Sequence, residues 1–501
     1  MSALTIKKFL RVATPSLDNN VGDAERVNIA LGENFDTKNI IWPLDLLRDI
    51  ARILRTNGGD ITATLFTDGD TIKIINIESG NTADSHFGIA VDIGTTVVAA
   101  ELVDLHKGKS LAAAGDINGQ VVYGEDLLTR LHFSSQGGLS KLHQTLLDTI
   151  NGLIAKVCDI ANIDVNQVSA ICAAGNTSMT HLLLGLDPSP IRREPYAPVL
   201  AKVPMFAAKD LGLNIMPNAA VYIFPSVGSF LGGDLVAGAL SAGIDERDEI
   251  SLLLDIGTNG EMILGNNEWL LAGAGAAGPA LEGGVAECAK RAEPGAIDRV
   301  NIDKATLEPS YSVIGDIEPT GLCGSGLIDA IAALYNAGLL DTTGHFILEK
   351  NTDRWQLINN KPAYIIRYAD KTRGIPLIYI SEKDIQNVMR TKAAMVAALT
   401  ILLDSVGLDI NSIDRVYTAG SFGIHLSIES SKAIGLYPKL PTERFVQLGN
   451  GSLKGAKEVL LNAGKINDAN RIAEKITYLE LNIHPAFMSI FRSAKYLDGG
   501  H

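Results

Sequence analysis

The sequence is poor in cysteine and in aromatic residues, and it contains no long apolar run. Its four cysteines, Cys158, Cys172, Cys288 and Cys323, lie far apart and form no C-x-x-C pair. This spacing argues against an iron–sulfur cluster held by this chain. No stretch approaches the roughly eighteen uninterrupted apolar residues of a membrane span, and the first residues lack the apolar core of a signal peptide. We therefore expect a cytoplasmic protein with no membrane partner.

Positive charge is also scarce, since the formal net charge is -14 and no cluster of Lys and Arg stands out. This balance argues against sequence-independent binding to nucleic acid. The chain has 501 residues, of which 46% are hydrophobic and 20% charged, enough for two or three packed domains. We expect an ordered globular protein whose partner is another protein or a small molecule.

The chain has no Walker-type phosphate loop, but it carries one short motif twice. VDIGTTVV occupies residues 91–98 and LDIGTNGE occupies residues 254–261, each behind an apolar strand. Residues of strand character follow both motifs, so each predicts a strand–turn–strand hairpin rather than the start of a helix. Either copy alone would be an ordinary Asp-Gly turn. Their repetition favours a functional interpretation.

A second landmark recurs in the same order. NIDVNQVSAICAAGN at 162–176 aligns with GLDINSIDRVYTAGS at 407–421, and each copy follows a helical stretch. Two ordered landmarks indicate an internal duplication within an alternating α/β sequence. The wider spacing in the second half predicts an inserted subdomain at about 266–383.

These patterns predict four regions along the chain. We expect a polar arm or linker at 1–34, a small α+β middle domain at 35–80 with one helix and a hairpin, a first lobe at 84–250 and a second lobe at 251–501.

The residues of the repeated turn suit a phosphate group. Glycine allows close approach of the backbone, successive N–H groups bind one anion, and threonine hydroxyls add donors. Asp92 and Asp255 repel phosphate unless a divalent cation lies between. Mg²⁺ binds few carboxylates together with water and phosphate oxygens, so the two aspartates predict a magnesium–nucleotide site.

This duplicated arrangement resembles the actin-like ATPase superfamily. The resemblance implies two actin-like (RNase H-like) lobes around a nucleotide cleft, with ATP and Mg²⁺ as ligands. It implies phosphate binding by the two hairpins, at Gly94, Thr95, Thr96, Gly257, Thr258 and Asn259. It also implies an adenosine-binding turn at TAGSFG, with Gly420, Ser421 and Gly423, for which Gly324 and Ser325 of GLCGSG are a competitor or a helper.

Other carboxylates are catalytic candidates. Asp234 begins a helix of small residues, where it either complements the helix dipole or positions the water that attacks the γ-phosphate. Glu282 in GPALEGG has the same two interpretations, and Glu261 contacts either metal-bound water or nothing.

Further motifs narrow the family. The chain contains, in this order, AAGNTSMTHLLLG (173–185), AAGPALEGG (276–284), AEPGAI (292–297), GLCGSGLIDAIAAL (321–334), AGSFG with AIGLYP (419–438) and LGNGSLKGA (448–456). From about residue 12 to about 496 it resembles the reductive activators of corrinoid-dependent methyltransferases and corrinoid iron–sulfur proteins. The resemblance implies an ATPase that returns Co(II) corrinoid to Co(I), a corrinoid protein or methyltransferase as partner, and a homodimer.

The sequence departs from that family in two places. Members usually carry an N-terminal [2Fe–2S] domain or C-terminal [4Fe–4S] clusters, whereas this sequence has neither. Three explanations stand: the redox domain lies outside this sequence, a separate ferredoxin supplies electrons, or the chain has another role. Gly273 and Ala274 also replace a Cys-Ser pair typical of the family. A small-molecule kinase of the same superfamily is the alternative function, and a filament-forming relative fits the fold but not the motifs.

Overall fold

The computed structural model describes residues 2–18, 20–229, 231–257, 260–275, 286–420, 426–481 and 484–497. The chain forms two units, each described by itself. The first unit contains residues 1–241 and 452–474, and the second contains residues 242–451 and 475–501.

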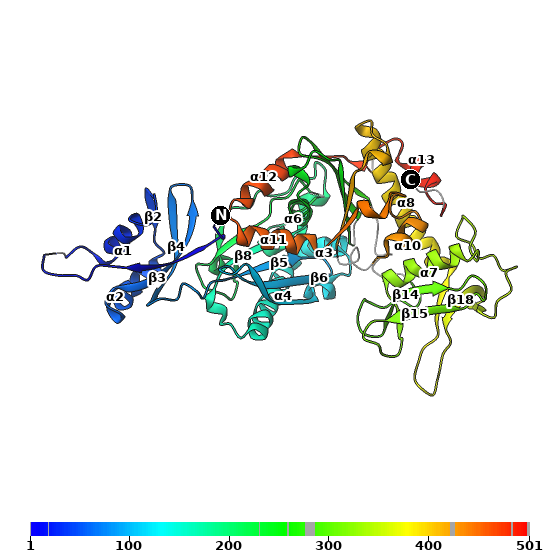
Figure 1. Cartoon of the computed structure of the whole chain (residues 1–501), viewed down its shortest axis with the longest axis horizontal. Coiled ribbons are helices and arrows are strands. Elements are labelled where there is room, and N and C mark those ends of the chain that lie inside the picture. Colours follow the sequence, from blue (N-terminus) through cyan, green and yellow to red (C-terminus); the bar gives the residue numbers. More distant parts are fainter. Residues whose placement is uncertain are drawn as a thin grey trace. The chain divides into compact units, whose positions relative to one another are not determined.

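The first unit begins with a small α+β module, drawn in blue in Figure 1. Its sheet has the strand order β1-β3-β4-β2. Its elements are β1 (Ile6–Arg11), α1 (Asp23–Gly32), β2 (Asn39–Ile41), α2 (Leu44–Thr56), β3 (Asp60–Asp68) and β4 (Thr71–Ser79). The expected helix and Asp-Gly hairpin are confirmed as α2 and the antiparallel pair β3–β4.

The first 34 residues differ from the expected polar arm. β1 pairs with β3 along its whole length, and Val27 and Leu31 of α1 are buried in the same core as Ile50 and Leu54 of α2. Only the polar loop between β1 and α1 matches an arm. The apolar residues of the two short elements lie on single faces, and burial against α2 and β3 outweighs the polarity of the surrounding sequence.

The rest of the first unit is built on a six-stranded sheet of order β7-β6-β5-β8-β10-β9. β5, β6 and β7 form an antiparallel meander, whereas β8 and β10 run parallel to β5. The strands are β5 (Phe87–Ile93), β6 (Val97–Asp104), β7 (Lys109–Ile117), β8 (Val168–Gly175), β9 (Phe206–Ala207) and β10 (Ala220–Ile223). The helices are α3 (Leu127–Phe133), α4 (Leu139–Ala161), α5 (Thr177–Leu183), α6 (Gly233–Ala242), α11 (Gly451–Leu461) and α12 (Lys465–Lys475).

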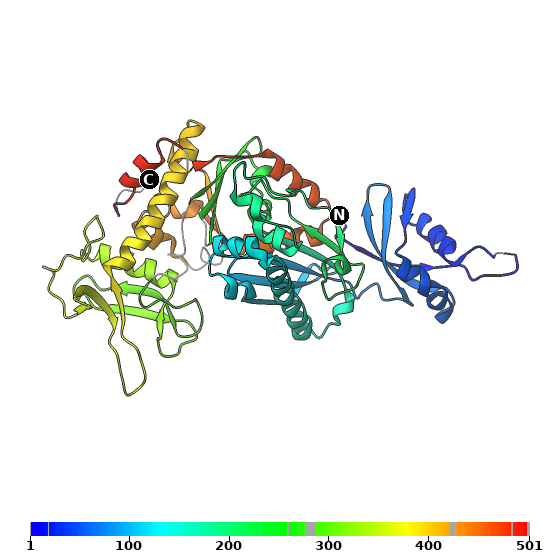
Figure 2. The same ribbon diagram turned by 180° about the vertical axis from the view of Figure 1, so that it is seen from behind.

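The second unit repeats this sheet. Its strand order is β21-β20-β11-β12-β13-β22, with an antiparallel meander β11–β12–β13 and with β20 and β21 parallel to β11. The strands are β11 (Ser251–Ile256), β12 (Gly260–Gly265), β13 (Leu270–Gly275), β20 (Arg415–Ala419), β21 (Phe445–Gly449) and β22 (Ile476–Tyr478). The long helix α8 (Glu382–Ser405) packs on β12 and β13 as α4 packs on β6 and β7 (Figures 1 and 2). The duplicated actin-like α/β fold is thereby confirmed.

Two small three-stranded sheets lie within the range where the sequence predicts an insertion. Their strand orders are β15-β14-β16 and β17-β18-β19. The elements of this region are β14 (Ala296–Ile302), β15 (Pro309–Val313), β16 (Gly321–Leu322), α7 (Gly324–Asn336), β17 (Trp355–Ile358), β18 (Lys361–Arg367) and β19 (Ile378–Ser381). Two further helices, α10 (Ile428–Ala433) and α13 (Phe487–Ser493), complete the second unit.

The unit boundary differs from the one expected at residue 251. Helices α11 and α12 lie late in the sequence, yet they pack in the first unit. A Cβ on Gly455 of α11 would lie 2.2 Å from the Ala237 carbonyl oxygen of α6, so the two backbones are in direct contact. Lys457 also pairs with Glu101 of β6 at 2.8 Å. Close helix packing, rather than chain position, assigns this segment to the first unit.

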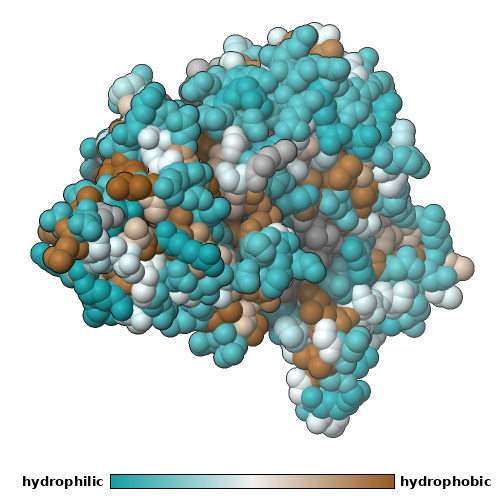
Figure 3. Space-filling view, turned by 60° about the vertical axis from the view of Figure 1, so that its left-hand side comes forward, coloured by the Kyte–Doolittle hydropathy of each residue, from teal (hydrophilic) through white to brown (hydrophobic). Residues whose placement is uncertain are grey.

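The surface is largely hydrophilic on the face shown in Figure 3, with small hydrophobic groups between. Among the helices within the described ranges, none combines the length and apolar character needed to cross a bilayer.

Candidate functional site

Hydrogen bonds to its carbonyl oxygens hold the turn after β5 in place. Asn118 donates from Nδ2 to the Gly94 oxygen at 3.0 Å and from its backbone nitrogen to the Thr96 oxygen at 2.9 Å. Arg130 Nη1 donates to the Thr95 oxygen at 2.6 Å. In a trans peptide the N–H points away from the preceding C=O, so the Thr95 and Thr96 amides face away from these donors. Successive amides left on one side of a turn can bind an anion, which is the role that the sequence predicts for this turn.

Side chains complete the same turn. A Cβ on Gly94 would lie 2.2 Å from the Val97 carbonyl oxygen, so only glycine fits there. Asn176 donates from Nδ2 to the Thr95 hydroxyl at 3.0 Å, and its Oδ1 accepts a hydrogen bond from the Met179 amide at the start of α5. One side chain therefore caps a helix and orients a hydroxyl of the turn.

Three polar side chains from distant segments meet beside this hairpin. Asp92, near the end of β5, accepts a hydrogen bond from the Ser452 hydroxyl at 2.9 Å. Burial, and then the negative charge of Asp92, raise the pKa of Asp234, in the first turn of α6, to about 7. Two neighbouring carboxylates disfavour ionisation of both unless a cation lies nearby. The pair therefore suits a hydrated divalent cation.

The second hairpin repeats the register of the first. In the first unit Asp92 lies beside Ala174, and in the second Asp255 lies beside Ala419. Each alanine precedes the glycine that the sequence alignment pairs, Gly175 or Gly420. The two landmarks of the duplication thus lie at the same place in both sheets.

Gly420 lies against the carboxylate of Asp255. Its φ is +92°, and an added Cβ would lie 2.5 Å from the Ile256 carbonyl oxygen and 2.6 Å from Asp255 Oδ1. Glu261 faces Asp255 across the antiparallel pair β11–β12 and is buried. Like charges at opposed strand positions are unfavourable, which again suits a cation.

Several expected site residues lie outside the described residues, namely Thr258, Asn259, Glu282, Ser421 and Gly423. Gly257 lies directly after β11, and Gly324 is the first residue of α7. Ser325 is buried and donates its hydroxyl to the Asp298 carbonyl oxygen at 3.1 Å. The Ser325 hydroxyl thus has its hydrogen-bond partner within the protein. Among the expected site residues, the structure brings Asp92 close to Asp234 and Gly420 into contact with Asp255.

The four cysteines are free thiols: Cys158 lies in α4 and Cys172 in β8, whereas Cys288 and Cys323 lie outside the helices and strands. Burial raises the pKa of Cys158 to about 11 and also raises the pKa of Cys172 and Cys288. These thiols stay protonated, and a protonated thiol is a poor metal ligand or nucleophile. Within the described ranges no group of three or more His, Cys, Asp or Glu side chains is arranged to hold a metal ion.

Arg130 and Asn118 were not among the residues singled out in the sequence. Arg130 is fully buried and also donates from Nε to the Gly124 oxygen at 2.8 Å. Burial lowers the pKa of Arg130 to about 10, so it remains charged at neutral pH. No local motif marks these residues, because they lie 24 and 35 positions after the turn residues that they contact, and only the tertiary structure brings them to the turn.

Replacing Arg130 by Lys is expected to raise the KM for ATP about tenfold. The Arg130 guanidinium donates to the carbonyl oxygens of both Gly124 and Thr95, and an ammonium group cannot make both charge-assisted hydrogen bonds in this geometry, so one is lost. Steady-state ATP hydrolysis measures the effect. Arg444→Lys is the matched control, because Arg444 also donates to two backbone carbonyl groups, those of Asn411 and Ile413, away from both hairpins. Equal KM values for the two variants would contradict the role of Arg130.

Comparison with known families covers almost the whole chain. Residues 1–84 match the RACo linker region, residues 87–247 match the RACo middle region, and residues 249–500 match the C-terminal domain of RACo, the ASKHA domain.

Individual relatives agree with these matches. The corrinoid activation enzyme RamQ of Eubacterium limosum is 32% identical over 415 residues, covering 81% of this chain and 69% of RamQ. A Co(II) methylated amine-specific corrinoid protein reductase of Methanosarcina barkeri is 26% identical over 423 residues, covering 78% of this chain and 73% of the reductase. The solved structure of a reductive activator for corrinoid, iron–sulfur protein superposes with a TM-score of 0.91 at 37% identity, covering 99% of this chain and 79% of that one. The chain therefore belongs to the family of reductive activators of corrinoid proteins, with their linker, middle and ASKHA regions in the same order.

Proposed function

We propose that this protein hydrolyses ATP to return a corrinoid protein, or a corrinoid-dependent methyltransferase, from Co(II) to Co(I). The observation that carries the proposal is the duplicated strand–turn–strand hairpin. In the first unit Asp92 lies near the end of β5, beside the parallel strand β8, which ends at Gly175. In the second unit Asp255 lies near the end of β11, beside the parallel strand β20, which Gly420 follows. Membership of the activator family supports the choice of partner.

The residues of the two hairpins would share the binding of Mg²⁺–ATP. The amides of Thr95 and Thr96, with their hydroxyl groups, would bind phosphate oxygens, and so would Thr258 and Asn259. Mg²⁺, held through water by Asp92 and Asp255, would supply positive charge against the phosphate oxygens. The Gly420 turn would bind adenosine.

Asp234 is the described carboxylate best suited to position the attacking water. It is partly buried next to Asp92, and its raised pKa means that it exchanges a proton near neutral pH. A group with such a pKa accepts a proton from water and returns it at little cost. Hydrolysis then yields ADP and phosphate without a covalent intermediate on the protein.

The reduction itself adds one electron to Co(II) and gives Co(I). A low-potential iron–sulfur protein such as a ferredoxin is the proposed donor, and the active species is proposed to be a homodimer. ATP hydrolysis contributes the free energy that an uphill electron transfer requires.

The experiment combines the protein, a Co(II) corrinoid protein and a reduced low-potential ferredoxin under anaerobic conditions. The Co(I) absorption spectrum is expected to appear with Mg²⁺–ATP but not with a non-hydrolysable analogue, and the corrinoid protein is expected to stimulate phosphate release. Formation of a phosphorylated metabolite in proportion to ADP would favour the small-molecule kinase and contradict the proposal.

A further inference from the structure

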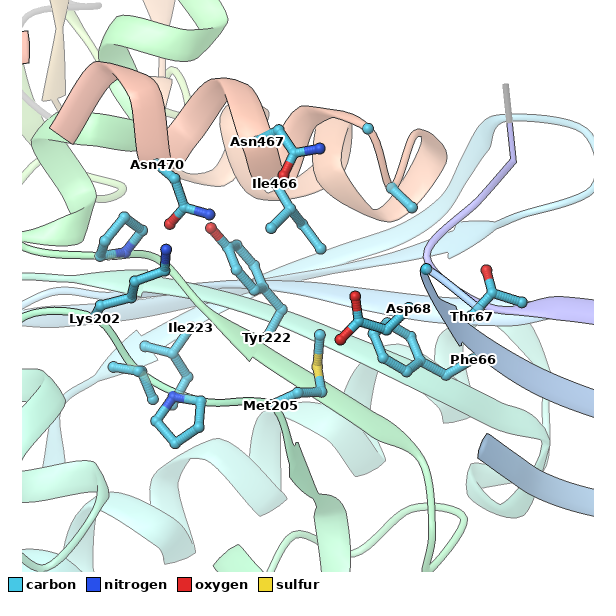
Figure 4. Close-up of a pocket in the computed structure, with 16 residues that line it drawn as sticks. Phe66, Thr67, Asp68, Lys202, Met205, Tyr222, Ile223, Ile466, Asn467 and Asn470 are labelled. Atoms are coloured by element: carbon cyan, nitrogen blue, oxygen red, sulfur yellow. The ribbon is translucent and has the colours of Figure 1, made fainter. Parts of the chain in front are cut away.

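A cavity lies in the first unit, at the open edge of its six-stranded sheet (Figure 4). It has a volume of about 530 Å³, within the range of about 300 to 1,000 Å³ typical of small-molecule sites. Three segments far apart in the sequence line it: the tip of the β3–β4 hairpin at 66–69, the segment at 202–205 with β10, and the beginning of α12 at 463–470.

The edge is open because β9 is only two residues long. Phe206 and Ala207 pair with Val221 and Ala220, so β10 continues past the end of its partner strand. Tyr222 is the first residue beyond this pairing. The side chain of Met205, which precedes β9, lies in the cavity instead of extending the sheet (Figure 4).

Tyr222 carries a buried hydroxyl that lacks a protein partner. The residue is 5% exposed, and its hydroxyl has no hydrogen-bond partner among the described residues. A buried hydroxyl left unpaired is costly, so native proteins rarely keep one without a function. Burial also raises the pKa of Tyr222, and the neutral hydroxyl is available as a donor.

The polar groups of the cavity gather at one end. Figure 4 shows the Tyr222 hydroxyl, the Lys202 ammonium group and the Asn470 amide directed toward the same place. One cation and two neutral groups that can donate suit a carboxylate. Asp68 lines the cavity away from this group and disfavours a second negative charge on the ligand.

The remaining lining is apolar and suits a flat ring. Phe66, Met205 and Ile466 line the cavity, with Phe66 next to Asp68 and with Met205 and Ile466 nearer to the polar end (Figure 4). A thioether and an aromatic ring both make favourable contacts with an aromatic ligand. We propose that this cavity is a binding site for a small aromatic monocarboxylate, separate from the two hairpins, with Tyr222, Lys202 and Asn470 holding the carboxylate.

The test uses benzoate as the probe and the full chain labelled with ¹³C at the methionine methyl groups. Benzoate is expected to shift the Met205 methyl resonance, assigned by Met205→Leu, in a saturable manner. Benzyl alcohol, with the same ring but no charge, and benzylamine, with the opposite charge, are expected to bind at least about tenfold more weakly, because each lacks the charge-assisted hydrogen bonds.

Tyr222→Phe removes only the unpaired hydroxyl, whose burial is costly, so the variant is expected to fold with a thermal stability equal to or higher than that of the unaltered protein. Its affinity for benzoate is expected to fall about tenfold, the loss of one hydrogen bond to a charged group. Tyr417→Phe is the control, since Tyr417 is 4% exposed, comparable to Tyr222, and lies in the second unit.

Three results would overturn the proposal: benzoate leaves the Met205 resonance unshifted, benzyl alcohol binds as tightly as benzoate, or Tyr222→Phe binds benzoate as tightly as the unaltered protein. Saturating Mg²⁺–ATP is expected to leave benzoate affinity unchanged. Competition between the two ligands would also refute a site separate from the hairpins.

Discussion

Replacing Asp234 by Asn is expected to reduce ATP hydrolysis at least about a hundredfold while raising the melting temperature of the nucleotide-free protein at pH 7. The loss of activity follows because an amide cannot accept the proton of the attacking water. The gain in stability follows because the native protein holds a carboxylate that is poorly solvated and close to Asp92. Removing a charge that both burial and the neighbouring Asp92 disfavour stabilises the fold.

The stability effect of Asp234 depends on pH with a defined sign. The pKa of Asp234 is raised from 3.8 to about 7 in the folded protein. Between these values the folded state binds the proton and the unfolded state does not, so rising pH in this range lowers the free energy of unfolding. The stability difference between Asp234→Asn and the unaltered protein is therefore expected to grow from pH 4 to pH 7.

Melting curves at several pH values and steady-state phosphate release measure the two effects. Asp159→Asn, on the exposed side of α4, is the control and is expected to change neither. Full activity of Asp234→Asn would exclude a role in positioning water. A stability difference that does not vary with pH would exclude the proximity of two carboxylates as its cause.

Replacing Gly420 by Ala is expected to abolish ATP turnover by displacing Asp255. The new methyl group would have to occupy a point 2.6 Å from Asp255 Oδ1 and 2.5 Å from the Ile256 carbonyl oxygen. Neither contact is tolerated, and the φ of +92° adds backbone strain of about 1 kcal/mol or more. Turnover is expected to fall at least about a hundredfold, because a displacement of about 1 Å at a catalytic group has effects of this size.

Gly407→Ala is the control that separates the effect of backbone strain from the effect of displacing Asp255. Gly407 has a φ of +67°, and an added Cβ there meets nothing within 4 Å. This variant is expected to lose about 1 kcal/mol of stability with unchanged turnover. Phosphate release and thermal denaturation compare the two variants. If Gly420→Ala retained turnover, the Gly420 turn would not be part of the Asp255 site.

The fold could be predicted largely from local sequence. Each hairpin is made by residues close together in the chain, with apolar strands on both sides of Gly94 or Gly257, so the pairing of its two strands depends little on the rest of the molecule. The duplication was visible because the second landmark follows each hairpin in the same order. The packing of residues 6–32 could not be predicted from local sequence, because the burial of Val27 and Leu31 depends on α2, which lies later in the chain.

The surroundings of the hairpins required the tertiary structure. Ser452 reaches Asp92 across 360 positions of the chain, and Arg130 reaches Thr95 across 35. The same holds for the cavity beside Tyr222, where a hairpin, a strand edge and a late helix converge. Motifs report the residues that chemistry requires at a turn, since those residues act locally. Which carboxylates share a site, and which hydroxyl remains unpaired, depends on how distant segments pack.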